Sequence, residues 1–233
     1  VTRCKEFLPD PRRGCRSTVN SPHPRCRAMR AARPVHQESM SVERIQQHFR
    51  DSAALHAEAA DALSLPIAAA VDAMFAALAN GNKIVACGDG PSAAAAHYLA
   101  VSLVGGFERE RPGLPAIALA TDASQGGLAG AVSADQLFAQ QVRVLGQTGD
   151  ILLVLDPAGA SPRVLAAIDE AHEREMTVVA LTGGEGHAVA AALSDTDIPI
   201  SVPAVRAARI HEVHLLTIHC LCDGIDAMLL GED

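Results

Sequence analysis

One segment, residues 83–103, constrains the fold of this chain more than any other. Residues 84–87 form a short apolar run typical of a buried strand, and glycines then interrupt it. An alanine-rich helical pattern follows from Ser92, which stands where a helix N-cap belongs. In an open parallel sheet such a loop lies at the carboxyl end of its strand, where backbone N–H groups and the helix N-terminus favour an anion. The segment therefore predicts an α/β fold, and its loop is the first place to expect a ligand.

Strand-like and helical segments alternate along the rest of the chain. The sequence predicts further strands at 116–120, 151–155, 177–181 and 198–202, and helices at 135–145, 162–174 and about 205–229. Parallel strands joined by helices are covered on both faces of their sheet. We therefore expect a five-stranded parallel sheet in a three-layer α/β/α sandwich.

Two long helices are expected before the first strand. Val42, Ile45 and Phe49 recur at helical spacing, and the same period returns after Pro66, which is expected to break the helix. The Asn-Gly-Asn turn at 80–82 is expected to end the second helix.

Charge is distributed unevenly along the chain. Residues 1–38 hold nine Lys and Arg against three acidic residues, which leaves ten basic and 24 acidic residues, a net charge of −14, in 39–233. A domain with this negative charge binds nucleic acid poorly, because it repels the phosphate backbone. Aromatic residues make up only 3% of the chain, so few side chains are available to stack on bases. We therefore expect no direct nucleic-acid partner.

The N-terminal segment is predicted to differ from the rest of the chain. Five prolines and no apolar period predict that residues 1–39 are a disordered basic extension, and that 40–233 form one folded domain. A targeting peptide is the alternative, although the segment lacks a secretory apolar region and has too many prolines for an amphipathic presequence. We favour a plain extension upstream of Met40.

Hydropathy and cysteine usage bear on the cellular compartment. No apolar run approaches the ~20 residues of a membrane span. Cys87, Cys220 and Cys222 fall in predicted elements, and positions 220 and 222 point to nearly opposite sides of a helix, so they cannot chelate one ion together. They are interpreted as small buried hydrophobes in a reducing compartment. We expect a soluble cytoplasmic protein without a membrane partner.

Four motifs resemble those of one known family. They are Cys-Gly-Asp-Gly-Pro-Ser at 87–92, Phe-Glu-Arg-Glu-Arg-Pro-Gly-Leu-Pro-Ala-Ile-Ala-Leu at 107–119, Gly-Asp-Ile-Leu-Leu at 149–153 and Ala-Arg-Ile-His-Glu-Val-His at 208–214. From Met40 onward the chain resembles the sugar isomerase (SIS) domain, of flavodoxin-like fold, and within it the phosphoheptose isomerase group. The resemblance implies a homotetramer built by the N-terminal and final helices, with phosphosugar sites near the subunit boundaries.

The catalytic positions depart from the pattern of that group. The family uses a His and a Glu on the helix after the first loop, and a Gln and a His on the last helix, around zinc; the Glu and the last His transfer protons. Here Tyr98 and Ser102 stand at the first two positions, and His211 and His219 at the last two. Proton abstraction needs a base of suitable pKa, which a Ser without an activating partner is not. The substitutions predict a broken isomerase mechanism, with His219 catalytic only if the protein is active.

A metal is expected only if the isomerase interpretation holds. His211 and His219 are then a weak candidate pair for zinc. His97 is one residue away from the family position, which turns its side chain by about 100°. Ordinary interface histidines are the favoured interpretation, and no cofactor is expected.

The phosphate loop is altered as well. The family's hydroxyl-rich loop after the third strand becomes Asp-Pro-Ala-Gly-Ala-Ser at 156–161, which loses three hydroxyls and adds a carboxylate that repels phosphate. Ser92, Asp122, Ser124 and Ser161 are the remaining candidates for binding a phosphosugar. We expect at most weak binding of a sugar phosphate.

The last helix points to another role. Residues 215–226 are more similar to initiator-associating members of the group, which bind the replication initiator DnaA, and Leu229 and Leu230 are candidate partner contacts. We therefore expect a non-catalytic homotetramer that binds DnaA and promotes its assembly at the origin. The alternatives are a phosphoheptose isomerase acting on sedoheptulose 7-phosphate and a phosphosugar-binding sensor.

Overall fold

The computed structural model describes residues 35–121, 133–184 and 186–231. The chain divides into two compact units, 1–45 and 46–233, and the sheet with its covering helices belongs to the second unit. The predicted disorder of residues 1–39 falls largely outside the described residues, although helix α1 already begins at Val35.

Five parallel strands form the sheet, as the apolar runs predict. They are β1 (Ile84–Gly88), β2 (Ala116–Ala118), β3 (Ile151–Asp156), β4 (Thr177–Gly183) and β5 (Ile198–Val202). Their order is β2-β1-β3-β4-β5. From β1 the chain adds β2 on one side and then crosses to add β3, β4 and β5 on the other side, so the order reverses between β1 and β3. This is the flavodoxin-like order, whose ligands bind outside the carboxyl ends of the strands at that switch point.

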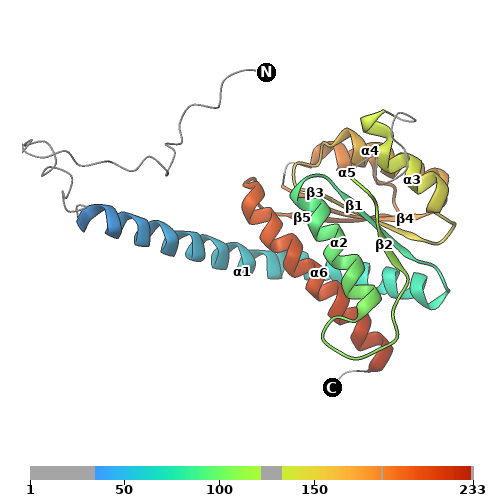
Figure 1. Ribbon diagram of the computed structural model, residues 1–233, viewed down its shortest axis with the longest axis horizontal. Coiled ribbons are helices and arrows are strands. Elements are labelled where there is room, and N and C mark those ends of the chain that lie inside the picture. Colours follow the sequence, from blue (N-terminus) through green and yellow to red (C-terminus); the bar gives the residue numbers. More distant parts are fainter. Residues whose placement is uncertain (1–34, 122–132, 185, 232–233) are drawn as a thin grey trace, which may run out of the picture. The chain divides into compact units, whose positions relative to one another are not determined.

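Helices cover both faces of the sheet (Figure 1). The second part of α1 (Val35–Ala79), α2 (Pro91–Gly105) and α6 (Ala207–Leu230) pack on one face, and α3 (Leu137–Leu145), α4 (Pro162–Glu173) and α5 (His187–Ala192) on the other, with a short 3₁₀ turn at Ala134–Gln136. The three-layer sandwich predicted from the alternation of strands and helices is confirmed.

Alternate strand residues supply two separate cores. On β3, Leu153 and Leu155 join the core under α1, α2 and α6, while Leu152 and Val154 join the core under α3 and α4. All six residues of β3 are buried, because its side chains meet helices on both faces. The central strands are therefore rigid, and they fix the loops at their carboxyl ends.

The N-terminal helical region is one helix, not two. Pro66 lies inside α1, so the predicted break there is wrong. An interior proline costs about 3 kcal/mol, but Leu63 before it and Ala70 and Met74 after it are buried in the core. Packing on both sides of the proline offsets its cost and keeps the helix continuous.

Two helices also correct the hydropathy expectation. Met40–Ala79 and Ala207–Leu230 are long and apolar enough to cross a membrane, judged by length and composition alone. Alanines raise the mean hydropathy of the first helix, and leucines and isoleucines raise that of the second. Leu55 of α1, with Ile218 and Ile225 of α6, lies in the core beneath these helices, as expected for helices that cover a sheet.

Candidate functional site

The loop after β1 is shaped by glycines and a proline. Helix α2 begins at Pro91, with Gly90 as its N-cap at a φ of 55°. Ser92 is therefore the second helical residue and not the N-cap that the sequence predicts, because a proline with fixed φ suits the first helical position. Ser92 is buried, and its Oγ has no hydrogen-bond partner among the described residues. A polar group able to donate to a ligand is thus left at the start of α2.

The loop after β3, residues 156–161, binds its own carboxylate. Asp156 accepts hydrogen bonds from the backbone N–H of Ala158 (3.2 Å) and of Ser161 (2.7 Å). Gly159, with a φ of 62°, passes so close to Gly186 that an added Cβ would lie 2.2 Å from the Gly186 Cα. Loop N–H groups of this kind bind anions, so the anion here is the protein's own.

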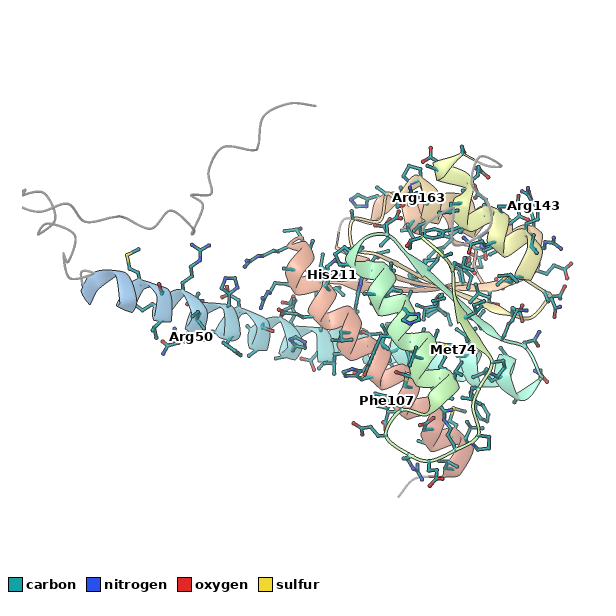
Figure 2. The ribbon with its side chains drawn as sticks, in the orientation of Figure 1. Arg50, Met74, Phe107, Arg143, Arg163 and His211 are labelled. Carbon is teal, nitrogen blue, oxygen red and sulfur yellow. The ribbon has the colours of Figure 1, made fainter. Side chains whose placement is uncertain are left out.

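A second carboxylate joins the two loops. Ser161 Oγ donates a hydrogen bond of 2.7 Å to Asp89 Oδ2, and the Arg163 guanidinium lies 3.1 Å from Asp89 Oδ1. Ser161 also caps α4 by accepting from the Val164 N–H (3.5 Å). Figure 2 shows Arg163 at the α4 side of the sheet. We call the loops 88–92 and 156–161, with Arg163, the loop pair.

The predicted phosphosugar residues are only partly placed. Ser92 and Ser161 lie in the two halves of the loop pair, at the carboxyl ends of neighbouring strands. Asp122 and Ser124 lie outside the described residues. Sequence spacing gives no sign of Arg163 or of the role of Asp89, since Asp89 is 72 positions from Ser161 and meets it only through the register of β1 and β3.

A second cluster lies on the exposed side of α2 and α6. Tyr98 Oη lies 3.2 Å from His219 Nε2, and the two rings meet edge to face with centroids 5.6 Å apart. Phe107 packs on the other side of the imidazole, at 5.4 Å between centroids. Tyr98 is 39% exposed. The sequence predicted a site at positions 98 and 219 through the resemblance, but not that a phenol and an imidazole bind each other.

Ser102 lies one turn after Tyr98 on α2 but is buried. Its carbonyl accepts a hydrogen bond of 3.2 Å from Arg111, which also donates to the carbonyl of Leu103 (2.8 Å). Arg111 forms a buried ion pair with Asp226 of α6. These contacts fasten the end of α2 to α6, and a buried hydroxyl in this setting lacks the basicity of a carboxylate.

Two further histidines lie on α6, and one of them, His214, contacts the sheet. His214 is completely buried, with Nε2 3.2 Å from the Thr182 carbonyl, and burial lowers its pKa to about 4. Loss of solvation also lowers the pKa of His211 below its ordinary value, and its ring lies 6.3 Å from that of His214. Both imidazoles are therefore neutral near pH 7.

The donor set does not fit the four-ligand zinc centre that the resemblance implies. Tyr98 and Ser102 stand where the resemblance implies a His and a Glu, and Ser102 is buried. His211 and His219 are then the two imidazoles left, and His219 Nε2 is next to the Tyr98 hydroxyl. Within the described ranges, no three His, Cys, Asp or Glu side chains gather to share an ion. A zinc pair at His211 and His219 stays a prediction.

The chain matches known proteins over most of its length. Residues 47–183 match the SIS domain model. A phosphoheptose isomerase of Aromatoleum aromaticum is 53% identical over 82% of this chain and 96% of its own, and that of Methylibium petroleiphilum is 51% identical over 83% and 97%.

Solved structures agree with these relatives. A phosphoheptose isomerase from Francisella tularensis is 43% identical, with a TM-score of 0.76 over 80% of this chain and 98% of that one. The enzyme from Neisseria gonorrhoeae is 42% identical, with a TM-score of 0.74 over 79% and 98%.

These matches correct the expected function. The prediction of a non-catalytic protein that binds DnaA is wrong, because relatives about half identical over nearly their whole length are named as isomerases. That prediction relied on Tyr98 and Ser102, on the altered loop at 156–161 and on the similarity of residues 215–226 to initiator-associating proteins. Leu229 and Leu230 lie exposed in the last turn of α6, but their exposure alone assigns them no partner.

Proposed function

The chain belongs to the SIS domain family and within it to the phosphoheptose isomerase group, and we propose from this that it interconverts the aldose and ketose forms of a phosphorylated sugar, with sedoheptulose 7-phosphate as substrate. The observation that carries the proposal is the contact between Tyr98 and His219, the Tyr98–His219 pair, at the position where the family transfers protons.

The pair has the chemistry that the reaction needs. Aldose–ketose isomerisation moves one proton between adjacent carbons and one between their oxygens, through an enediol. An imidazole can take the proton from one carbon and return it to the next, so one base serves both transfers. The Tyr98 hydroxyl, which lies 3.2 Å from His219 Nε2, is a donor for the substrate oxygen. Ser102 has no part in this scheme.

The phosphate is proposed to bind at the loop pair. Ser92 Oγ and Ser161 Oγ are hydroxyl donors at the beginnings of α2 and α4, where the helix dipoles also favour an anion. Asp122 and Ser124 are retained as candidates from the resemblance.

A second copy of the chain is proposed to complete the site. Ser92 and Tyr98 are six residues apart on α2, so the loop pair and the Tyr98–His219 pair are separated by about 9 Å along the helix axis. The face around the Tyr98–His219 pair is apolar and exposed at Val101, Leu215 and Leu216. Such a face favours association. We propose the homotetramer of the family, with the reaction in the cytoplasm, where the buried thiols of Cys87 and Cys222 stay reduced.

Purified protein tests the function directly. Wild type and His219→Ala are assayed with sedoheptulose 7-phosphate, with and without added zinc, and binding of the same sugar is measured by calorimetry. Turnover that His219→Ala abolishes supports the proposal. Binding without turnover would replace it with the sensor interpretation, which the substitution at Ser102 favours, and absence of both would overturn it.

A further inference from the structure

We propose that Asp89 is an internal competitor of the substrate phosphate: its carboxylate occupies Ser161 and Arg163, and a phosphoryl group binds by displacing it. This inference rests on the proposed binding of a phosphosugar at the loop pair. It adds Arg163 as the cation of the site and Asp89 as the residue that sets its affinity.

The contacts of Asp89 are those of a bound anion. One carboxylate oxygen accepts from Ser161 Oγ at 2.7 Å, and the other lies 3.1 Å from the Arg163 guanidinium. A hydroxyl and a guanidinium, converging on two oxygens of one group, are the donors that proteins present to phosphate monoesters. The carboxylate thus satisfies both donors while no substrate is bound.

Asp89 and Asp156 differ in how firmly they are held. Asp156 is 7% exposed, and its partners are backbone N–H groups of its own loop, so it is part of the loop's structure. Asp89 comes from the other loop and binds two side chains, and its own side chain is 38% exposed, beside an Arg163 that is 31% exposed. Asp89 can therefore rotate into solvent while Ser161 and Arg163 keep their places.

Ser92 offers a further hydrogen-bond donor in the same loop as Asp89. Ser92 Oγ is buried and has no partner within the described part of the chain. Leaving a buried hydroxyl unpaired is unfavourable, and an oxygen of an incoming phosphoryl group would satisfy it. The Asp89 carboxylate, which binds Ser161 and Arg163, does not.

The exchange has a consequence for specificity. A phosphate monoester carries close to two negative charges at pH 7 and three strong acceptor oxygens, whereas a carboxylate carries one charge and two oxygens. Displacing Asp89 is favourable only for the more highly charged group. Ligands of the site are therefore phosphate monoesters, and neutral sugars and sugar acids are excluded.

Calorimetry with inorganic phosphate and with sedoheptulose 7-phosphate tests this inference. Asp89→Asn keeps the size of the side chain and removes its charge, and is expected to lower Kd for both probes about tenfold. Arg163→Gln is expected to raise Kd about tenfold. Asp169→Asn, an exposed aspartate on α4, is the matched control for net charge and leaves Kd unchanged.

The outcomes separate this inference from the proposed function. An unchanged or higher Kd in Asp89→Asn, or an effect equalled by Asp169→Asn, would overturn the competition by Asp89 even if the wild type is an active isomerase. Tighter phosphate binding in Asp89→Asn, together with a wild type that shows no turnover, would keep the inference and overturn the proposed isomerase activity.

Discussion

The loop pair and the Tyr98–His219 pair differ in how completely their polar groups are already bonded. In the loop pair, two carboxylates accept from loop N–H groups, a hydroxyl and a guanidinium, and Ser92 Oγ is a buried side-chain atom without a partner among the described residues. On α2 and α6, one phenol–imidazole contact lies on an exposed apolar face. We propose from this contrast that the first region governs affinity for the ligand and the second governs the rate of the chemical step.

The strongest way to break this division is to remove the base. His219→Ala is expected to lower kcat by about 10²–10⁴-fold, because it deletes the group proposed to move the carbon proton, while Kd for the sugar phosphate stays within twofold. Steady-state kinetics and calorimetry provide the two numbers. His97→Ala, an exposed histidine of α2, is the control and leaves both unchanged. A large rise in Kd with kcat intact would reverse the assignment.

The buried ion pair between Arg111 and Asp226, which links the end of α2 to α6, can be removed without changing the Tyr98–His219 pair. Arg111→Ala leaves the Asp226 carboxylate buried without its partner, which is expected to lower the free energy of unfolding by about 3–5 kcal/mol. Urea denaturation measures the loss. Arg143→Ala, which removes a half-exposed partner of Glu170, is the comparison and has a much smaller effect. Equal effects of the two variants would show that burial of the Arg111–Asp226 pair does not matter.

The pH dependence of the free energy of unfolding tests the buried state of His214 on α6. His214 is buried and neutral, with a pKa lowered to about 4 from 6.5, so the unfolded chain binds a proton at a higher pH than the folded one. Its contribution to stability is therefore fully present above pH 6.5 and is lost as the pH falls toward 4, by about 3 kcal/mol in all. Urea midpoints between pH 4.5 and 7.5 measure it. The slope should flatten in His214→Gln, and an unchanged slope would contradict the assignment.

The smallest expected effect distinguishes the phenol from the imidazole. Tyr98→Phe removes only the hydroxyl that lies 3.2 Å from His219 Nε2 and keeps the ring contact. It is expected to lower kcat about tenfold and to leave KM within twofold, whereas changes in the loop pair act on KM. A variant with unchanged kcat would leave His219 as the only working member of the pair.

Much of the fold follows from the sequence because the sheet is buried on both faces. Apolar runs such as residues 151–155 are interrupted by turns, and each became a strand within a few residues of its predicted bounds. Features that depend on tertiary packing were not predicted. The continuity of α1 through Pro66 is stabilised by core contacts that no local pattern reveals.

The candidate site was predictable in its positions and not in its bonding. Ser92, Ser161 and His219 stand where the motifs place them. The helix starts two residues earlier than the sequence predicts, with Gly90 instead of Ser92 as its N-cap. The partners of Asp89 lie more than 70 residues away, so both features depend on geometry that spacing cannot encode. The functional error had the same origin, since a missing Glu was visible in the sequence and the Tyr98–His219 contact was not.

One measurement tests the central claim most directly: NMR of sedoheptulose 7-phosphate incubated with the protein in D₂O. Wild type is expected to form the aldose isomer and to replace the transferred carbon-bound proton with deuterium, because an enediol protonated by an exposed imidazole exchanges with solvent. His219→Ala is expected to do neither. A wild-type protein that binds the sugar phosphate and yields neither isomer nor exchange would contradict the account.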